Sequence, residues 1–404
     1  MTIDSAAVRR EFPAFAAQSR PLHYLDNAAT GQILGCALDA TVEFEVHSRA
    51  NVNRGNHRLA EAATAAFDLA RSRVARFLNA DAEEVVFTGG ATAAINLVAG
   101  AMRSRLRPGD EILVSYAEHH SNFLPWQRLR DEAGIVLRLL PLTADGRIDM
   151  RALGECVRER CRLIAVTHAS NVTGAVTDLP PLLAAARAVG ARVLLDGAQM
   201  VQHGPVDVRA AGADFYAFSG HKAFAPTGVG VLWGKREVLA ELPPFQTGGG
   251  TVAEVGVDST RYAEAPRRFE AGTPPIAQAV GLGRALEWLG RQDWPAIHTH
   301  EATLTRQLLD ALAGMPGLRL LGPTELEARL PIVSFAVAGL HPHDVCQILD
   351  RHGVALRGGH HCAQPLLRCF GFDGLTRASI ALYNSEADIA ALQLGLDDAR
   401  RILA

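Results

Sequence analysis

The sequence predicts an α/β fold with a largely parallel sheet that helices cover on both faces. From about residue 84 to residue 233, short apolar segments alternate with segments whose apolar residues recur at helical spacing. Alternating strands and helices favour parallel strands joined by crossover helices. The chain has 404 residues, of which 48% are hydrophobic, so it can bury a large core. A chain of this length typically forms about two or three domains.

Seven apolar segments are predicted to be strands, because Gly, Pro, Asp or Asn bounds them. Their residue ranges are 84–88, 111–115, 136–140, 163–167, 192–195, 215–218 and 230–233. Helices are predicted between several of these strands. Ile95, Val98, Ala99 and Met102 recur at positions i, i+3, i+4 and i+7, and residues 182–189 nearly repeat that spacing.

The ligand site is predicted at one edge of this sheet. In open parallel sheets, ligands bind beyond the carboxyl ends of the strands. Thr92, His119, Asp196 and Lys222 each follow the end of a predicted strand. We therefore expect these four side chains to face a common site.

The C-terminal part of the chain is predicted to differ in organisation. Residues 242–275 are rich in Gly and Pro and show little periodicity, which predicts a long loop that is functional or forms an interface arm. Helices are predicted after it at 277–290 and 294–314. A smaller α+β portion follows, with a strand at 332–338, a helix at 342–351 and a terminal helix that begins with a capping box at Ser385.

Composition argues against several classes of protein. The formal net charge is −3 and Lys and Arg do not cluster, so a nucleic-acid interface is not expected. No window approaches the roughly eighteen apolar residues that a membrane span needs. Residues 1–15 lack the apolar core of a secretory signal. The six scattered cysteines do not resemble a disulfide framework, so we expect a cytoplasmic protein.

The segment around Lys222 gives the strongest indication of chemistry. An apolar run leads into Ser219, Gly220, His221 and Lys222, and a second apolar run follows at 229–233. A lysine at a strand-end turn, flanked by a hydroxyl and an imidazole, suits a Schiff-base lysine beside a bound phosphate. A lysine considered alone is more often a solvated turn residue, so the assignment depends on its companions.

Asp196 is the first companion, because it ends an apolar strand where an unpaired carboxylate would be costly. A helix cap or an internal salt bridge explains such a residue equally well. The functional interpretation is a partner for a protonated pyridine nitrogen, with Gln199 three residues later in reach of a ring hydroxyl.

A Gly-rich turn at residues 89–92 offers free N–H groups at the start of a helix, which suit a phosphate. It matches neither a P-loop nor a dinucleotide fingerprint, and an ordinary strand-to-helix turn is the commoner interpretation. His119 follows another strand and is flat enough to stack on a heteroaromatic ring. A surface histidine is the alternative there.

Cys362 is the second companion, because Arg357, His360 and His361 surround it and favour its thiolate. Arg357 and Arg377 each suit the capture of an α-carboxylate. A zinc site at His360, His361, Cys362 and Cys369 has a spacing that fits no usual ligand pattern. Lysine, aspartate and cysteine together indicate pyridoxal-phosphate chemistry on a sulfur-containing substrate.

The chain resembles the group II (SufS/CsdA-type) cysteine desulfurases of the class V aminotransferase superfamily. The resemblance runs from residues 24–30 to residues 377–384. Its most specific segments are 118–126, 196–199, 219–222 and 357–365. It implies an L-cysteine desulfurase that releases alanine and passes sulfur to a protein acceptor, with selenocysteine as a further candidate substrate.

The resemblance also implies fold type I of the pyridoxal-phosphate-dependent transferases and a homodimer. In this fold a large domain contains a mixed, mainly parallel seven-stranded sheet, expected here at residues 19–290. The smaller α+β domain is expected at residues 1–18 and 291–404, and it would carry the cysteine loop.

Roles for site residues follow from the same resemblance. Lys222 would bind the cofactor covalently, Cys362 would carry the persulfide, and His119 would stack on the ring and shuttle protons. The remaining cofactor contacts would be Asp196, Gln199, Ala91, Thr92, Ser219, His221 and Thr273 of the partner subunit. The substrate contacts would be Arg377, Arg357 and Asn171, and no metal is expected.

Three positions depart from the family's pattern: Asn53 within residues 51–55, where His is expected, and Ala91 and Ala93, where relatives often carry polar groups. These departures affect specificity more than the class of reaction.

Two alternative enzyme hypotheses are a transaminase and a β-lyase of the same superfamily. The non-enzymatic hypothesis is a sulfur-relay scaffold that depends on another protein.

Overall fold

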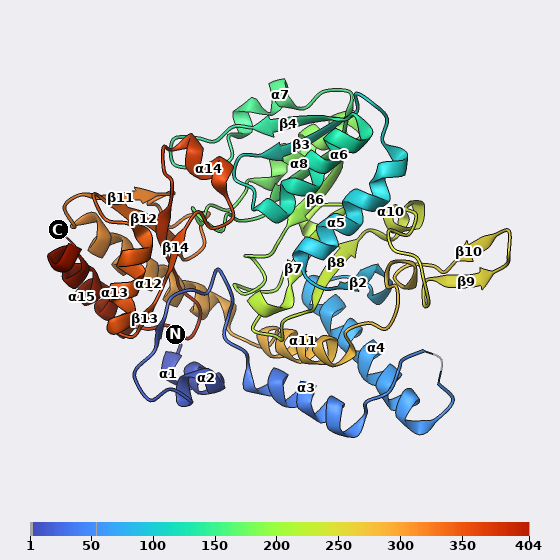
Figure 1. Ribbon diagram of the computed structural model, residues 1–404, viewed down its shortest axis with the longest axis horizontal. Helices are drawn as coiled ribbons and strands as arrows, with labels where there is room; N and C mark the ends of the chain where they lie inside the picture. The colour runs from blue at the N-terminus through green and yellow to red at the C-terminus, as the bar shows by residue number, and fades with distance from the viewer. Residues whose placement is uncertain (1–2, 54, 404) are drawn as a thin grey trace.

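The computed structural model describes residues 3–53 and 55–403. Its central element is a seven-stranded sheet in the order β2-β8-β7-β6-β5-β3-β4 (Figure 1). Only β8 runs antiparallel to its neighbours β2 and β7, and the other adjacent strands are parallel. The strands are β2 (Val85–Thr88), β3 (Glu111–Ser115), β4 (Val136–Leu140), β5 (Cys161–Thr167), β6 (Arg192–Asp196), β7 (Phe215–Ser219) and β8 (Gly230–Gly234). All seven predicted strands are confirmed, and so is the mainly parallel α/β class.

The sheet is buried on both faces because alternate residues of its strands enter two apolar clusters. Tyr216 and Phe218 of β7 face the cluster that contains α4 (Arg58–Leu78), α8 (Leu179–Val189) and α11 (Ile276–Leu289). Phe215 of β7 faces the other cluster, with α5 (Ala91–Met102) and α6 (Leu124–Ala133).

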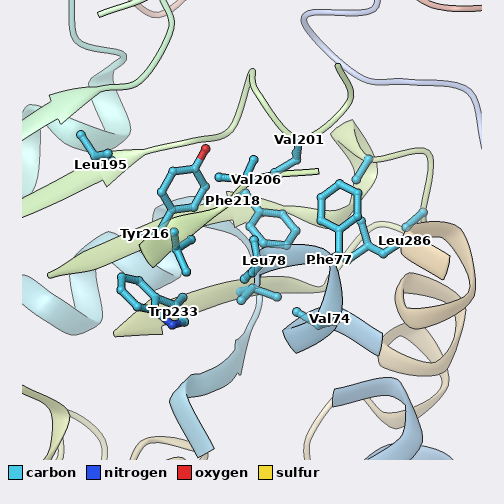
Figure 2. Packing of buried hydrophobic residues seen from close by; sticks show 14 of the residues in the cluster. Val74, Phe77, Leu78, Leu195, Val201, Val206, Tyr216, Phe218, Trp233 and Leu286 are labelled. Atoms are coloured by element: carbon cyan, nitrogen blue, oxygen red, sulfur yellow. The ribbon is translucent and has the colours of Figure 1, made fainter. Parts of the chain in front are cut away.

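The first of these clusters is dense where β7 and β8 meet α4. Figure 2 shows Tyr216, Phe218 and Trp233 packed near Val74 and Leu78. Trp233 and Phe218 are fully buried, so truncating either to alanine should cost about 3–5 kcal/mol. This packing fixes the ends of β6 and β7, from which Asp196 and Lys222 project.

A second, antiparallel sheet lies on the opposite side from the β9–β10 hairpin in Figure 1. Its strands in order are β11 (Leu318–Leu321), β12 (Ile332–Val337), β15 (Leu375–Ser379) and β14 (Arg357–Gly359). Helices α12 (Trp294–Ala313), α13 (Pro342–Arg351) and α15 (Glu386–Leu403) pack against it. These elements confirm the predicted helices and strand of the C-terminal part.

The N-terminal segment joins this second region. β1 (His23–Tyr24) pairs in parallel with β13 (Val354–Ala355), and Asp26 forms an isolated parallel bridge to Ser379. Leu25 lies fully buried in the cluster formed with α13 and α15. Residues 23–26 are therefore fixed beside strands that lie more than 300 positions later in the sequence.

The expectation of a long irregular loop at residues 242–275 was wrong in part. This segment contains an antiparallel hairpin of β9 (Val252–Val255) and β10 (Thr260–Tyr262), which extends away from the central sheet in Figure 1. Most of the hairpin's residues are exposed, so its strands lack the apolar alternation by which the other strands were predicted.

The remaining elements are short or peripheral. They are α1 (Ser5–Arg10), α2 (Pro13–Ala16), α3 (Gly35–His47), α7 (Leu153–Cys156), α9 (Val208–Ala211), α10 (Arg236–Glu241), α14 (Gln364–Cys369) and the 3-10 turns Ala82–Glu84, Arg103–Arg105, His120–Asn122, Met150–Ala152, Gly220–Lys222 and Arg267–Phe269. Across residues 3–53 and 55–403, no helix has the length and apolar character to cross a bilayer.

Candidate active site

A cavity of about 330 Å³ lies at the carboxyl ends of the parallel strands, where the second sheet approaches the first. It brings together nearly all the predicted site residues, although they come from distant parts of the chain. Those that line it are Ala91, Thr92, His119, Asn171, Asp196, Gln199, Ser219, His221, Lys222, Arg357, Cys362 and Arg377. Thr273 is the exception, since it lies in a separate hollow with Asn53 and Gly250.

Lys222 ends the turn after β7 and points into this cavity. Burial lowers the pKa of its amine to about 8, although the carboxylate of Asp196 acts in the opposite direction. Because only the neutral amine is nucleophilic, this shift increases the reactive fraction at neutral pH.

Asp196 is buried at the end of β6. Its Oδ1 accepts the backbone N–H of Ala198 at 3.0 Å. Burial raises the pKa of its carboxyl, while that hydrogen bond and Lys222 oppose the rise. A buried carboxylate of this kind gains most from a cationic partner, and a protonated ring nitrogen would supply one.

Gln199 carries an unsatisfied polar atom at the same site. Its amide nitrogen donates to the carbonyl of Ala28 at 2.9 Å, whereas its buried Oε1 has no partner. A buried acceptor without a donor costs about 1–3 kcal/mol. A ring hydroxyl in the cavity would satisfy this atom, so the residue fits the predicted cofactor.

His119 begins a short turn after β3, and its Nδ1 accepts the backbone N–H of Ser121 at 3.1 Å. The neutral ring therefore carries its proton on Nε2. Burial, followed by the charge of Lys222, lowers the pKa of His119 to about 3. A neutral, flat ring in this position suits stacking on an aromatic cofactor.

Glu118 precedes His119 in the sequence, is fully buried and was not predicted to be a site residue. Its carboxyl accepts from the hydroxyl of Ser115 and from Asn122 Nδ2, at 2.6 Å for the latter. Complete burial raises the pKa of Glu118 to about 8, which favours the neutral acid, while hydrogen bonds from Ser115, Asn122 and Thr167 oppose the rise. The available signal is a carboxylate shortly after an apolar strand, the same type of signal that marks Asp196.

The other end of the cavity has the features of a phosphate site. The N-terminus of α5 points toward it, and the Ala91 N–H donates to Ser219 Oγ at 2.8 Å. Thr92 Oγ1 lies 2.7 Å from Ser121 Oγ, and His221 Nδ1 lies 3.1 Å from Thr30 Oγ1. Hydroxyls beside a helix N-terminus are favourable for an anion.

Gly90 is required at this helix start. Its φ is +146°, and an added Cβ would lie 3.2 Å from Ser219 Oγ. A larger residue would strain the turn and crowd the hydroxyl that faces the cavity. Together with Gln199 and Asp196, this cradle shows that the residues present fit a phosphorylated pyridine ring.

Cys362 is exposed at the rim, in the loop between β14 and α14. Both His361 and Cys362 have positive φ angles, of 50° and 53°. Two hydrogen bonds fix this conformation from the other side of the cavity. Asn171 Nδ2 donates to the His361 carbonyl at 2.8 Å, and the His120 N–H donates to the Cys362 carbonyl at 2.7 Å. A strained backbone conformation persists when surrounding contacts stabilise it in this way. The conformation orients the Cys362 thiol toward the cavity.

Arg377 and Arg357 complete the rim. Arg377 is buried, which lowers the pKa of its guanidinium, and its Nη1 donates to the Asn171 carbonyl at 2.9 Å. Its Nε is buried without a partner.

In the described part of the chain, no group of three or more His, Cys, Asp or Glu is arranged to hold a metal ion.

The departures noted in the sequence lie in different places. Ala91 is buried at the start of α5, whereas Ala93 is exposed on its first turn. Asn53 has a φ of 72° and lies near Thr273, outside the cavity. Arg54, within the same segment, is outside the described residues.

Comparisons with known proteins agree with this geometry. The family model for the class-V aminotransferases matches residues 23–392. The chain is 45% identical to a cysteine desulfurase of Dickeya dadantii over 401 residues, which cover 98% of this chain and 97% of that protein. It is 44% identical to a probable cysteine desulfurase of Streptomyces coelicolor, with coverage of 98% and 97%.

A solved structure shares the fold. The cysteine desulfurase CsdA of Escherichia coli, in an S-sulfonic acid form, matches with a TM-score of 0.93 and 40% identity over the full length of both chains. The chain therefore belongs to the class-V aminotransferase family and, within it, to the SufS/CsdA-type cysteine desulfurases, whose cofactor is pyridoxal phosphate.

Proposed function

We propose that this protein is an L-cysteine desulfurase that releases L-alanine and retains the sulfur as a persulfide on Cys362. One observation carries the proposal: an exposed cysteine lies at the rim of the same cavity that contains the half-buried Lys222 and the buried Asp196. A thiol at the rim can reach the sulfur of a substrate whose α-carbon lies near the lysine. Full-length relatives that are cysteine desulfurases support the same activity.

The cavity residues would hold pyridoxal 5′-phosphate in one orientation. Lys222 would attach it, Asp196 would face the ring nitrogen, and His119 would cover one face of the ring. Residues at the start of α5, with Ser219 and His221, would bind the phosphate. When bound, the cofactor supplies an electron-withdrawing ring that stabilises negative charge at the substrate's α-carbon.

The residues of the chain then divide the remaining work. Arg377, with Arg357 beside it, orients the substrate carboxylate. Lys222 Nζ accepts the α-proton, which the lowered pKa of its amine favours. The Lys222 ammonium formed in this way returns a proton to the developing product, and His119 at the cavity wall donates a hydrogen bond from Nε2.

Cys362 carries out the sulfur transfer. Its thiolate sulfur forms a bond to the substrate sulfur while the substrate's Cβ–S bond breaks and its electron pair moves to carbon. Cβ then gains a proton and becomes the methyl group of alanine. Selenocysteine presents a similarly soft atom at the same position, so we propose it as a second substrate. The persulfide on exposed Cys362 would then pass to a thiol of an acceptor protein.

We also propose a homodimer. Two exposed valines, Val255 and Val257, lie on the protruding β9–β10 hairpin, and a partner chain would cover them. Thr273 lies outside its own chain's cavity, which is consistent with a contribution to the partner's phosphate site.

We further propose two domains, a large one at residues 19–290 and a small one at residues 1–18 and 291–404. We propose a cytoplasmic location, with which the free cysteines are consistent.

The experiment measures alanine and sulfide production from L-cysteine in the presence of a thiol reductant. The parent and the matched control Cys369→Ala, which alters another exposed cysteine, should produce alanine at similar rates. Cys362→Ala should keep the cofactor but lose activity by at least about 10²-fold, because it lacks the nucleophile. Alanine production by Cys362→Ala at the parent's rate would exclude the persulfide. If none of the three proteins makes alanine with cofactor bound, sulfide without alanine would favour a β-lyase, and neither product would favour a transaminase of the same family.

A further inference from the structure

Asp26 is a charged residue that contacts two arginines of the cavity and has no part in the mechanism above. It follows β1 in the N-terminal segment, and its backbone is bridged to Ser379 at the end of β15. Its side chain is only 13% exposed. The fold therefore fixes both the backbone and the direction of this carboxylate.

The Asp26 carboxylate binds both rim arginines at once. Arg357 Nε lies 3.2 Å from Oδ1 and 3.1 Å from Oδ2, and Arg357 Nη2 lies 3.1 Å from Oδ2. Arg377 Nη2 donates to Oδ1 at 3.2 Å. Arg357 and Arg377 are register partners on β14 and β15, so the two guanidiniums and the carboxylate form a compact cluster.

The charges of this cluster leave one positive charge unmatched. Two guanidiniums placed on paired strands repel each other, and the side chain of Arg377 is only 2% exposed. A buried cation of this kind needs a compensating anion. Asp26 compensates one of the two charges, so the cluster has a net charge of +1, which equals the charge that one substrate carboxylate would neutralise.

The hydrogen bonds also decide which donors remain free. Asp26 accepts from Nη2 of Arg377 and the Asn171 carbonyl accepts from Nη1, while the Nε of Arg377 is buried and has no partner. Asp26 likewise occupies Nε and Nη2 of Arg357 and leaves Nη1 available. Without Asp26, the half-exposed Arg357 side chain would have no fixed orientation.

We propose that Asp26 is a positioning residue for recognition of the substrate's α-carboxylate. It orients Arg357 and Arg377 and sets their combined charge, so that Arg357 Nη1 is free for the carboxylate and Arg377, which also lines the cavity, adds a fixed positive charge. The identity of the substrate as an amino acid rests on the proposed function. The role of Asp26 in selecting a carboxylate can be measured without turnover.

The test compares Asp26→Asn with the parent holoenzyme and with a matched control, Asp398→Asn. Asp398 also pairs with an arginine, Arg401, but on the exposed surface of α15. In Asp26→Asn, the KM for L-cysteine should rise by about tenfold or more while kcat changes by less than about threefold, because the lost interaction orients the bound substrate. Asp398→Asn should leave both constants within about twofold of the parent.

A binding measurement separates this proposal from the desulfurase activity. Two probes are used, 3-mercaptopropionate, which has a thiol and a carboxylate, and cysteamine, which has a thiol and no carboxylate. Asp26→Asn should weaken binding of 3-mercaptopropionate about tenfold and change binding of cysteamine by less than about twofold. If the parent makes no alanine, the proposed function fails, while the two probes still test Asp26 by equilibrium dialysis.

Two results would overturn the proposal. One is an unchanged KM and an unchanged affinity for 3-mercaptopropionate in folded Asp26→Asn, which would limit Asp26 to a structural role. The other concerns Asp26→Glu, which keeps the charge and serves if Asp26→Asn does not fold. Asp26→Glu should bind 3-mercaptopropionate within about threefold of the parent, and equal weakening of both probes in that variant would contradict a role in carboxylate recognition.

Discussion

The floor and the rim of the cavity are built in different ways. The floor, with Asp196, Lys222 and His119, projects from ends of the parallel strands, and burial shifts the pKa values of its groups. The rim, with Cys362 and Arg357, belongs to the second region and is exposed to solvent. Backbone geometry and hydrogen bonds across the cavity fix its position. Burial therefore sets the protonation states of the floor residues. At the rim, the position of the Cys362 thiol relative to the cavity determines whether it can react.

The largest expected effect comes from removing the floor's lysine. Lys222 and Lys235 are the only lysines in the sequence, which provides a natural control. Lys222→Ala should lose covalently attached cofactor and reduce alanine formation by at least about 10²–10⁴-fold, because both the anchor and the base are removed. Lys235, at the far end of β8, pairs with Asp214 at 3.1 Å, and Lys235→Ala should retain activity.

Borohydride reduction followed by peptide mass spectrometry provides the measurement. In the parent and in Lys235→Ala, the fixed cofactor should map to the peptide that contains Lys222. Cofactor fixed to Lys235 in the parent would contradict the assignment of the floor. Circular dichroism checks that Lys222→Ala is folded.

A smaller effect is expected from pH. Burial lowers the pKa of the Lys222 amine from 10.5 to about 8, and only the neutral amine reacts with an aldehyde. The rate at which apo-protein takes up pyridoxal 5′-phosphate should therefore rise about tenfold per unit between pH 6 and pH 7 and level off above pH 8. Stopped-flow absorbance measures this rate. A rate that continues to rise through pH 10 would indicate a solvated lysine and would remove the distinction between floor and rim.

The same contrast explains how much the sequence could predict. The seven strands, and the selection of Lys222, Asp196 and Cys362 as residues of one site, could be predicted because local signals mark them, such as apolar runs that end in polar residues. Asp26 could not be assigned to a site, because its contacts join residues that lie 331 and 351 positions apart. The β9–β10 hairpin was missed because a short exposed ribbon leaves no apolar pattern.

The smallest predicted effect concerns Glu118, the fully buried acid that precedes His119 in the sequence. Burial raises the pKa of its carboxyl from 4.5 to about 8, so the folded state favours the protonated form. The stability that this preference contributes is fully present below pH 4.5 and is lost as the pH rises through 8. Glu118→Gln is neutral at every pH and keeps a carbonyl that can accept from Asn122 or Ser115. The Tm of Glu118→Gln relative to the parent should therefore increase by a few degrees between pH 5 and pH 8, measured by scanning calorimetry of the holoenzyme.

The control is Glu237→Gln, at an exposed position on α10, and its Tm should follow that of the parent. A Tm difference that stays constant for Glu118→Gln across this range would mean that Glu118 is ionised in the folded protein, so that hydrogen bonds to a carboxylate, not burial of a neutral acid, support His119.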